Sequence, residues 1–245
     1  MEHKEGLIVG RNAVLQALES GRTIDSVTVA QGQCGGQAGK IIDICRERKI
    51  PVKFADARKL DRLCDGAAHQ GVAAFAAAHE YAELDDIFAL AQSRNESPFI
   101  VVCDSLEDPH NLGAILRSAE AAGVHGVIIP KRNSVTLNYT VAKTSAGAIE
   151  YVPVVKVANL PAVIDELKAR GVWIFGADMD GTDYTALDYS GSIALVIGSE
   201  GRGIGRLVRE KCDFIASMPM RGKINSLNAS VAAGILMFEA AKHRN

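Results

Sequence analysis

The sequence lacks the features that place a chain in or across a membrane. No apolar stretch approaches the roughly 20 residues that a membrane-spanning helix needs. The opening residues, MEHKEGLIVGRNAV, contain no apolar core of signal-peptide length. We therefore expect a cytoplasmic protein with no membrane partner.

The cysteines and histidines are too few and too widely spaced in the sequence to indicate disulfides or a metal site. The five cysteines lie at positions 34, 45, 64, 103 and 212 without a CxxC pair, and their number is odd. None of the six histidines shows HxxxH or Cys/His spacing, so we expect no metal site. No secretion signal favours disulfides. Cys103 and Cys212 lie in or beside apolar runs and are interpreted as small buried hydrophobic residues.

A strong net charge is also absent. The 245 residues carry a formal charge of −2 at pH 7, which does not by itself indicate a nucleic-acid-binding protein. Residues 1–78 hold 11 Lys and Arg against 9 Asp and Glu, whereas residues 79–95 hold 1 against 4. The basic excess of the N-terminal part is small. Because phosphate binding depends on the local field, a basic patch there stays open as an interpretation.

Apolar periodicity divides the sequence into two α/β domains and a linker. Residues 1–78 alternate helical and strand patterns, which predicts a small α/β domain. Residues 79–95 are acidic and polar and are predicted to be a linker, with a helix packed on either domain as the alternative. Residues 96–245 contain continuous apolar runs at 99–105, 126–130, 151–157, 172–178, 193–199 and 214–219. Such runs favour a parallel sheet covered on both faces, with ligands at the carboxyl ends of the strands.

The first candidate loop, residues 106–124, reads LEDPHNLGAILRSAEAAGV. Asp108 is the predicted helix N-cap, and Arg117 points away from the apolar stripe of that helix. Gly113 lies one turn before Arg117 on the same face and is interpreted as leaving room for a ligand. The alternative is a surface arginine paired with Glu120, and Asn111 is equally ambiguous.

The second loop, residues 198–207, reads GSEGRGIGRL and follows an apolar strand. It suggests a dinucleotide fingerprint, but the spacing is GxGxG and not GxGxxG. No acidic residue closes a second strand about 20 residues later. Glu200 would also place a carboxylate where a pyrophosphate must lie. We therefore reject a nicotinamide-dependent oxidoreductase and expect an uncharged or cationic ligand.

The third loop, residues 217–230, reads SMPMRGKINSLNAS and leads into an apolar helix. Ser226 or Asn225 could cap that helix. Neither cap explains Asn228, which we place within the first turn beside buried positions. A buried amide needs hydrogen-bond partners, so we expect a ligand or a neighbouring loop to supply them.

Together the three segments resemble the SpoU (TrmH-type) family of RNA ribose 2′-O-methyltransferases. DPHNLGAILRSAEAAGV, LVIGSEGRGI and MPMRGKINSLNASVAAGILMFEA match the three family motifs in order, and the resemblance covers residues 98–245. In the N-terminal part, GRNAVLQAL and HQGVAA are similar to the substrate-binding domain of the branch that methylates 23S rRNA guanosine.

The resemblance implies a fold, a cofactor and a set of site residues. The implied fold is a trefoil-knotted parallel-sheet methyltransferase domain at 96–245, preceded by a small α/β RNA-binding domain and acting as a homodimer. S-adenosylmethionine would bind in the knot. The cofactor-binding positions would be Gly198, Met218 and Leu227, and the catalytic positions Asn111, Arg117, Glu200, Ser226 and Asn228.

The implied reaction is methyl transfer to a ribose 2′-hydroxyl, for which a guanosine of 23S rRNA is the expected substrate. Ser226 and Asn228 would position the reactants, and Glu200 would hold Arg117 or Asn111. Arg117 would orient the hydroxyl and its phosphate. Whether Arg117 also acts as the base stays open, because a guanidinium pKa lies above about 12. A tRNA substrate and a non-catalytic RNA-binding or assembly factor are the alternatives.

Overall fold

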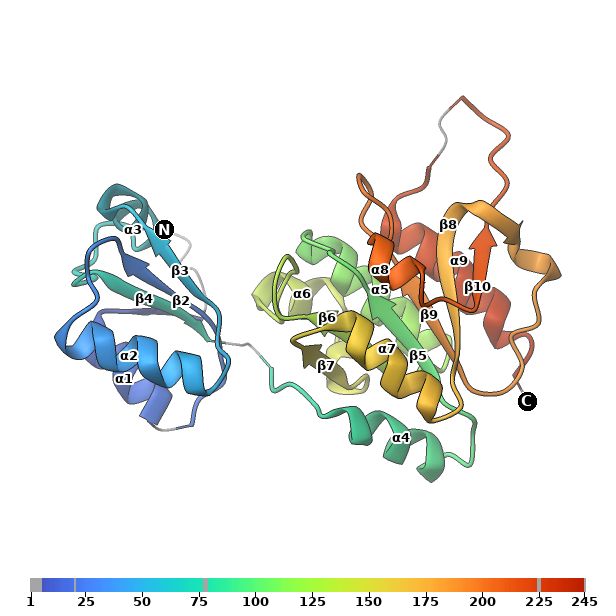
Figure 1. The fold of residues 1–245 in the computed structure, drawn as a ribbon, viewed down its shortest axis with the longest axis horizontal. Coiled ribbons are helices and arrows are strands. Elements are labelled where there is room, and N and C mark those ends of the chain that lie inside the picture. Colours follow the sequence, from blue (N-terminus) through green and yellow to red (C-terminus); the bar gives the residue numbers. More distant parts are fainter. Residues whose placement is uncertain (1–5, 20, 77–78, 224–225, 245) are drawn as a thin grey trace. The chain divides into compact units, whose positions relative to one another are not determined.

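The chain divides into two compact units, and the main boundary along the sequence lies between Glu80 and Tyr81. The structure is a computed structural model that describes residues 6–19, 21–76, 79–223 and 226–244 (Figure 1). Each unit has its own sheet and its own core. None of the helices in these ranges is long and apolar enough to cross a membrane.

The first unit is a four-stranded sheet with helices on both faces. Its strands have the order β1-β4-β2-β3, in which β4 runs antiparallel to β1 and β2, and β3 runs parallel to β2. Residues of α1 and α2 share the core on one face, and α3 contributes Leu60 to a smaller core on the other. The elements are β1 (Leu7–Val9), α1 (Arg11–Glu19), β2 (Ile24–Ala30), α2 (Gly36–Glu47), β3 (Val52–Ala55), α3 (Ala57–Leu63) and β4 (Val72–Ala76).

The second unit contains a six-stranded sheet in which all strand pairs are parallel, in the order β10-β8-β9-β5-β6-β7. Helices cover both faces of the sheet (Figure 1). The strands are β5 (Phe99–Cys103), β6 (Gly126–Pro130), β7 (Val154–Val157), β8 (Trp173–Asp183), β9 (Ile193–Ile197) and β10 (Phe214–Ser217). The helices are α4 (Leu84–Ser93), α5 (Pro109–Ala121), α6 (Tyr139–Thr144), α7 (Leu160–Ala169), α8 (Arg206–Arg209) and α9 (Ala229–Ala241), with short 3-10 turns at Ala148–Glu150 and Tyr184–Ala186.

The predicted parallel sheet is confirmed, because its strands coincide with the apolar runs of the sequence. Residues of β5 and β9 are buried along their whole length, as strands covered on both faces must be. The trefoil knot stays a prediction.

The segment predicted as a linker, residues 79–95, carries α4 and packs on the second unit. Ile87 is fully buried in its core, and Gly126 has no room for a side chain because Ile87 lies against it. The Ala82 amide donates to the Val154 carbonyl at 2.9 Å. The alternative of a packed helix therefore describes these residues better. The apolar residues of α4 recur at helical spacing, and this pattern outweighs the acidic composition of the segment.

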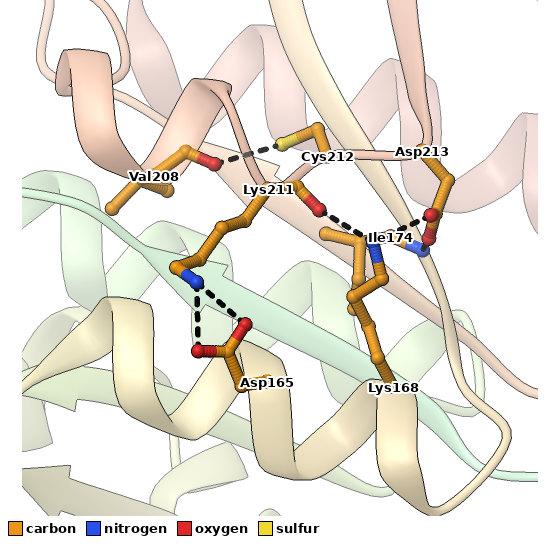
Figure 2. A network of polar contacts seen from close by, with 7 residues as sticks. All are labelled: Asp165, Lys168, Ile174, Val208, Lys211, Cys212 and Asp213. Atoms are coloured by element: carbon orange, nitrogen blue, oxygen red, sulfur yellow. Dashed lines mark hydrogen bonds and ion pairs between the residues drawn. The ribbon is translucent and has the colours of Figure 1, made fainter.

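A network of charged side chains fastens the connection between α8 and β10 to helix α7 (Figure 2). Lys211 contacts the Asp165 carboxylate at 2.6 Å, and Lys168 contacts that of Asp213 at 2.7 Å. Asp213 also accepts a hydrogen bond from the Ile174 amide of β8 at 2.9 Å. Because α8 follows the glycine-rich loop, this network holds the far end of that loop in place.

Candidate active site

The three motif loops all leave the carboxyl ends of neighbouring or nearby strands of the second sheet. The first connects β5 to α5, the second connects β9 to α8, and the third connects β10 to α9. In the sheet, β9 lies beside β5, and only β8 separates β9 from β10. Loops that are far apart in the sequence therefore lie together at the carboxyl-terminal edge of the sheet, where the strands end. Ligands of open parallel sheets bind at such an edge.

Helix α5 begins as the sequence predicts, and this places Asn111 at the edge. The Asp108 side chain accepts from the His110 amide at 2.8 Å, and Pro109 occupies the first turn. Gly123, just past the helix end, has a φ of 76°, in the left-handed region that favours glycine. Asn111 therefore lies in the first turn of α5, and its exposed fraction is only 7%.

The interpretation of Gly113 as an opening for a ligand was wrong. Gly113 is buried, and a Cβ at this position would collide with the Thr144 side chain of α6. The missing side chain therefore lets α6 approach α5. The sequence could not separate the two explanations, because a close helix contact and an open surface both favour glycine.

The glycine-rich loop after β9 folds back on itself. Ser199 and Gly203 exchange two backbone hydrogen bonds, of 3.1 and 2.8 Å. The backbone of Gly203 lies so close to Gly198 that a Cβ there would overlap it. The Gly205 amide donates to the buried Asp104 carboxylate at 2.7 Å. At least Gly198 therefore serves the loop's own packing, and Glu200 lies within the resulting turn.

Helix α9 begins later than predicted, and Asn228 is its N-cap. The Asn228 side-chain oxygen accepts from the amides of Ser230 at 3.0 Å and Val231 at 3.3 Å. Ser226 is not the cap, and Asn225 lies outside the described residues. The prediction failed because several cap-type residues stand in succession, and the one that caps is decided by where the chain turns into the helix.

Asn111, Glu200 and Asn228 form one hydrogen-bonded cluster that joins the three motif loops. The Asn111 amide donates to the Glu200 carboxylate at 3.1 Å. The Asn228 amide donates to the Asn111 carbonyl oxygen at 2.9 Å and also to Glu200. Asn228 is exposed and not buried as expected, but the partners expected for it are present as neighbouring loops. The resemblance implies that Glu200 holds either Arg117 or Asn111, and in the structure it holds Asn111.

A pocket of about 300 Å³ adjoins this cluster. All three predicted cofactor positions line it, and so do Glu200 and Ser226. Further lining residues are Ala177, Asp178, Met179, Ile197, Ser199, Gly201, Arg202, Gly203, Met220, Ala229 and Ala232, beside Gly198, Met218 and Leu227. Its charged side chains are two carboxylates and one guanidinium. Methionine and leucine walls with a net negative charge suit an apolar base and a sulfonium cation better than a diphosphate.

Comparison with known proteins agrees with this arrangement. The model of the SpoU rRNA Methylase family matches residues 98–238. A model described as RNA 2′-O ribose methyltransferase substrate binding matches residues 7–82. The chain belongs to the SpoU methylase family. A Bacillus subtilis protein, YacO, whose name assigns it to the TrmH family of tRNA/rRNA methyltransferases, is 48% identical over 246 residues, covering 100% of this chain and 98% of its own.

Solved structures of SpoU family proteins share the fold. The SpoU methyltransferase AviRb from Streptomyces viridochromogenes, in complex with AdoMet, matches with a TM-score of 0.61 and 26% identity over 96% of this chain and 89% of its own. The A. aeolicus TrmH/SpoU tRNA modifying enzyme matches with a TM-score of 0.54 and 28% identity over 65% of this chain and 84% of its own. This SpoU protein is an S-adenosylmethionine-dependent RNA methyltransferase.

Among the described residues, Arg117 forms no hydrogen bond or ion pair with the amide–carboxylate cluster of this SpoU protein. It is exposed on α5, and no ion pair with Glu120 or with any other residue forms in the described part of the chain. The surface ion pair that was its alternative interpretation is therefore not present. Its guanidinium remains available for a ligand, and its role stays a prediction.

Two carboxylates that support the pocket were not predicted. Asp104 follows β5 and holds the glycine-rich loop through the Gly205 amide. Asp178 lies in β8, lines the pocket, and accepts from Arg209 at 2.7 Å. Both stand where an apolar run of a buried strand ends, FIVVCD and WIFGAD, and a carboxylate at that position was the available signal.

The cysteines near the site are not nucleophiles. Burial raises the pKa of the Cys103 thiol to about 12 and that of Cys212 to about 11. Both thiols therefore stay protonated near neutral pH, and a protonated thiol is a weak nucleophile. Within the described ranges, no three His, Cys, Asp or Glu side chains group in a way that could hold a metal ion.

Proposed function

We propose that this SpoU methyltransferase methylates the ribose 2′-hydroxyl of a guanosine in 23S rRNA. The observation that carries the proposal is the Asn111–Glu200–Asn228 cluster, which joins the three motif loops beside the pocket. The match of residues 7–82 to a 2′-O ribose methyltransferase substrate-binding model supports the ribose as the acceptor. Transfer of labelled methyl to 23S rRNA as 2′-O-methylguanosine tests it.

The proposed reaction depends more on alignment of the two reactants than on activation of the methyl group. Bound S-adenosylmethionine supplies an electrophilic methyl group, so the chain must position the ribose hydroxyl and remove its proton. Alignment of this kind can lower a barrier by about 7–11 kcal/mol in favourable cases. We assign positioning to Ser226 and Asn228, and to Glu200 the holding of both asparagines. Arg117 then orients the hydroxyl and its phosphate through its planar fork of donors.

Two alternatives remain distinct from this proposal. A tRNA substrate is compatible with the name of the YacO relative, which covers both RNA types. The tRNA modifying enzyme matches 65% of this chain, whereas an AdoMet-bound rRNA methyltransferase from Sinorhizobium meliloti matches 97%, and this favours rRNA. A non-catalytic RNA-binding or assembly factor would not need the complete set of motif residues that this chain has.

We expect the protein to bind S-adenosylmethionine in the presence of a metal chelator. The pocket offers thioether, leucine and backbone groups, and no metal-binding cluster occurs in the described part of the chain. Titration calorimetry with EDTA should give one site per chain and an unchanged affinity when Mg²⁺ replaces the chelator. Binding that appears only with added metal would contradict the assignment.

The protein is also expected to be a homodimer that pairs through α9. Val231, Ile235 and Phe238 are 50%, 37% and 50% exposed and lie on one face of this helix. Sedimentation of residues 81–245 should show a dimer, and Phe238→Glu should convert it to a monomer. The fragment must begin at residue 81 because Ile87 belongs to its core. A monomeric fragment at micromolar concentration would rule out pairing through this unit.

Residues 1–80 are expected to select the RNA and not to perform chemistry. All pocket-lining residues and the three cluster residues lie after residue 80. Residues 81–245 should therefore bind S-adenosylmethionine as the full chain does but methylate 23S rRNA much more slowly. Site-specific methylation at the full rate by the shortened protein would show that the first unit is dispensable for selection.

A further inference from the structure

Two sequence motifs of the first unit, far apart in the chain, meet at one edge of its sheet. Gly10-Arg11-Asn12 follows β1, and His69-Gln70-Gly71 precedes the antiparallel β4. The Arg11 Nε donates to the Gln70 carbonyl at 2.6 Å, and its Nη2 donates to the Gln33 side chain. Gly71 leaves space for Gln33, whose side chain would lie 3.1 Å from a Cβ at that position.

The loop at Gln70 holds a backbone conformation that glutamine rarely adopts. Gln70 has a φ of 50° and Gly71 a φ of 79°. The His69 Nδ1 accepts from the Gly71 amide at 2.9 Å, and its Nε2 contacts Asp61 at 3.0 Å. Arg11 and His69 thus hold a non-glycine residue in the left-handed region. Conformations of this kind gather at functional sites, where surrounding contacts maintain them.

Neutral amides from this loop and from the first turns of α1 and α2 are exposed to solvent. Asn12, Gln37 and Gln70 are exposed, and the Gln37 amide donates to the Asn12 carbonyl oxygen at 2.8 Å. Within the described residues, the Gln70 side chain has no hydrogen-bond partner. We call this surface the amide edge, and its members are Arg11, Asn12, Gln33, Gln37 and Gln70.

We propose that the amide edge binds the unpaired bases of an RNA loop. Asparagine, glutamine and arginine carry donors in the geometry that recognises base edges, and single-stranded loops expose those edges. Four of the five members are uncharged, so the surface suits discrimination between bases better than general attraction to phosphate. The proposal rests on the proposed function, because it takes RNA as the substrate.

A protein partner fits the amide edge less well. Protein interfaces are centred on buried aromatic or aliphatic anchors. Among the described residues up to Glu80, Phe54 is the one large apolar side chain that is mostly exposed, at 53%. It lies on β3 and is not a member of the amide edge. An aromatic ring near an RNA-binding surface can instead stack on a base.

The test uses the full chain with a 23S rRNA transcript as the probe. Two variants remove amides without removing charge: Asn12→Ala with Gln37→Ala, and Gln70→Gly, in which glycine accepts the positive φ. Each should weaken binding to the transcript about tenfold while the salt dependence keeps its slope, since no charge is lost. Arg46→Ala is the control, because Arg46 is exposed at the end of α2, is not a member of the amide edge and pairs with Asp43. It should bind the transcript nearly as the wild type does.

The outcomes separate this proposal from the proposed function. Unchanged affinity of both amide variants for the transcript would overturn the amide edge as an RNA-binding surface. An equal loss of binding to polyuridylate would overturn base recognition. S-adenosylmethionine affinity and melting temperature should match the wild type, which shows that the variants fold. Failure of the proposed function would appear in the wild type itself, as absence of methyl transfer to 23S rRNA.

Discussion

Replacement of Arg117 by alanine should lower the rate of methyl transfer by about a hundredfold or more, because one positioned donor or proton acceptor contributes this much to catalysis. The side chain is exposed on α5, so stability should change by about 0.5 kcal/mol or less. Arg117→Lys should fail as well, since a point charge does not reproduce the planar fork that binds a phosphate and a hydroxyl together.

The measurement for Arg117 is single-turnover transfer to 23S rRNA at saturating S-adenosylmethionine. Arg206→Ala is a matched control, because Arg206 is also an exposed helical arginine and pairs with Glu210 one turn away. It should transfer methyl at nearly the wild-type rate. Substantial activity in the Arg117→Lys variant would remove Arg117 from the proposed mechanism.

Substitution of Gly198 by alanine should abolish most S-adenosylmethionine binding. The new Cβ would overlap the backbone of Gly203 and the Ile204 amide, and a backbone cannot move aside as a flexible side chain can. The turn that contains Glu200 must therefore open, which deforms the pocket wall and separates Glu200 from Asn111 and Asn228. We expect the affinity to fall by about a hundredfold, on the order of 3 kcal/mol.

Calorimetry of Gly198→Ala against Gly234→Ala isolates this effect. Gly234 lies within α9, and a Cβ there would meet the Ser118 hydroxyl at an ordinary 3.7 Å. The same added methyl should leave cofactor binding intact and raise stability by up to about 1 kcal/mol through helix propensity. Wild-type affinity in Gly198→Ala would mean that the glycine-rich turn is not part of the cofactor site.

The sequence predicts well those helices and strands that are specified by residues close together in the chain. Apolar runs without interruption specify the buried strands of the second sheet, and Asp108 with Pro109 specifies the start of α5. A packed α4 is only the alternative in the sequence-based prediction, because the acidic composition masks an apolar stripe that includes Ile87. In such a segment the acidic composition favours an exposed linker and the apolar stripe favours a packed helix. Burial of the Ile87 side chain favours the packed helix more strongly.

The candidate site was predictable from motifs but its geometry was not. Asn111 and Glu200 are 89 residues apart, and Asn111 and Asn228 are 117 apart, so no periodicity connects them. Their contacts depend on which strands become neighbours in the sheet. Gly113 shows the same limit, since only the position of Thr144 on α6 reveals why a side chain is excluded there.

The most direct test of the account is the identity of the methylated nucleoside. Ribosomal RNA and tRNA from cells lacking this gene, both as naked RNA and in ribosomal particles, are incubated with the protein and S-adenosylmethionine carrying a labelled methyl group. Digestion to nucleosides and mass spectrometry then locate the label. We expect 2′-O-methylguanosine from 23S rRNA. A label confined to tRNA, or present on a base and not on ribose, would contradict it.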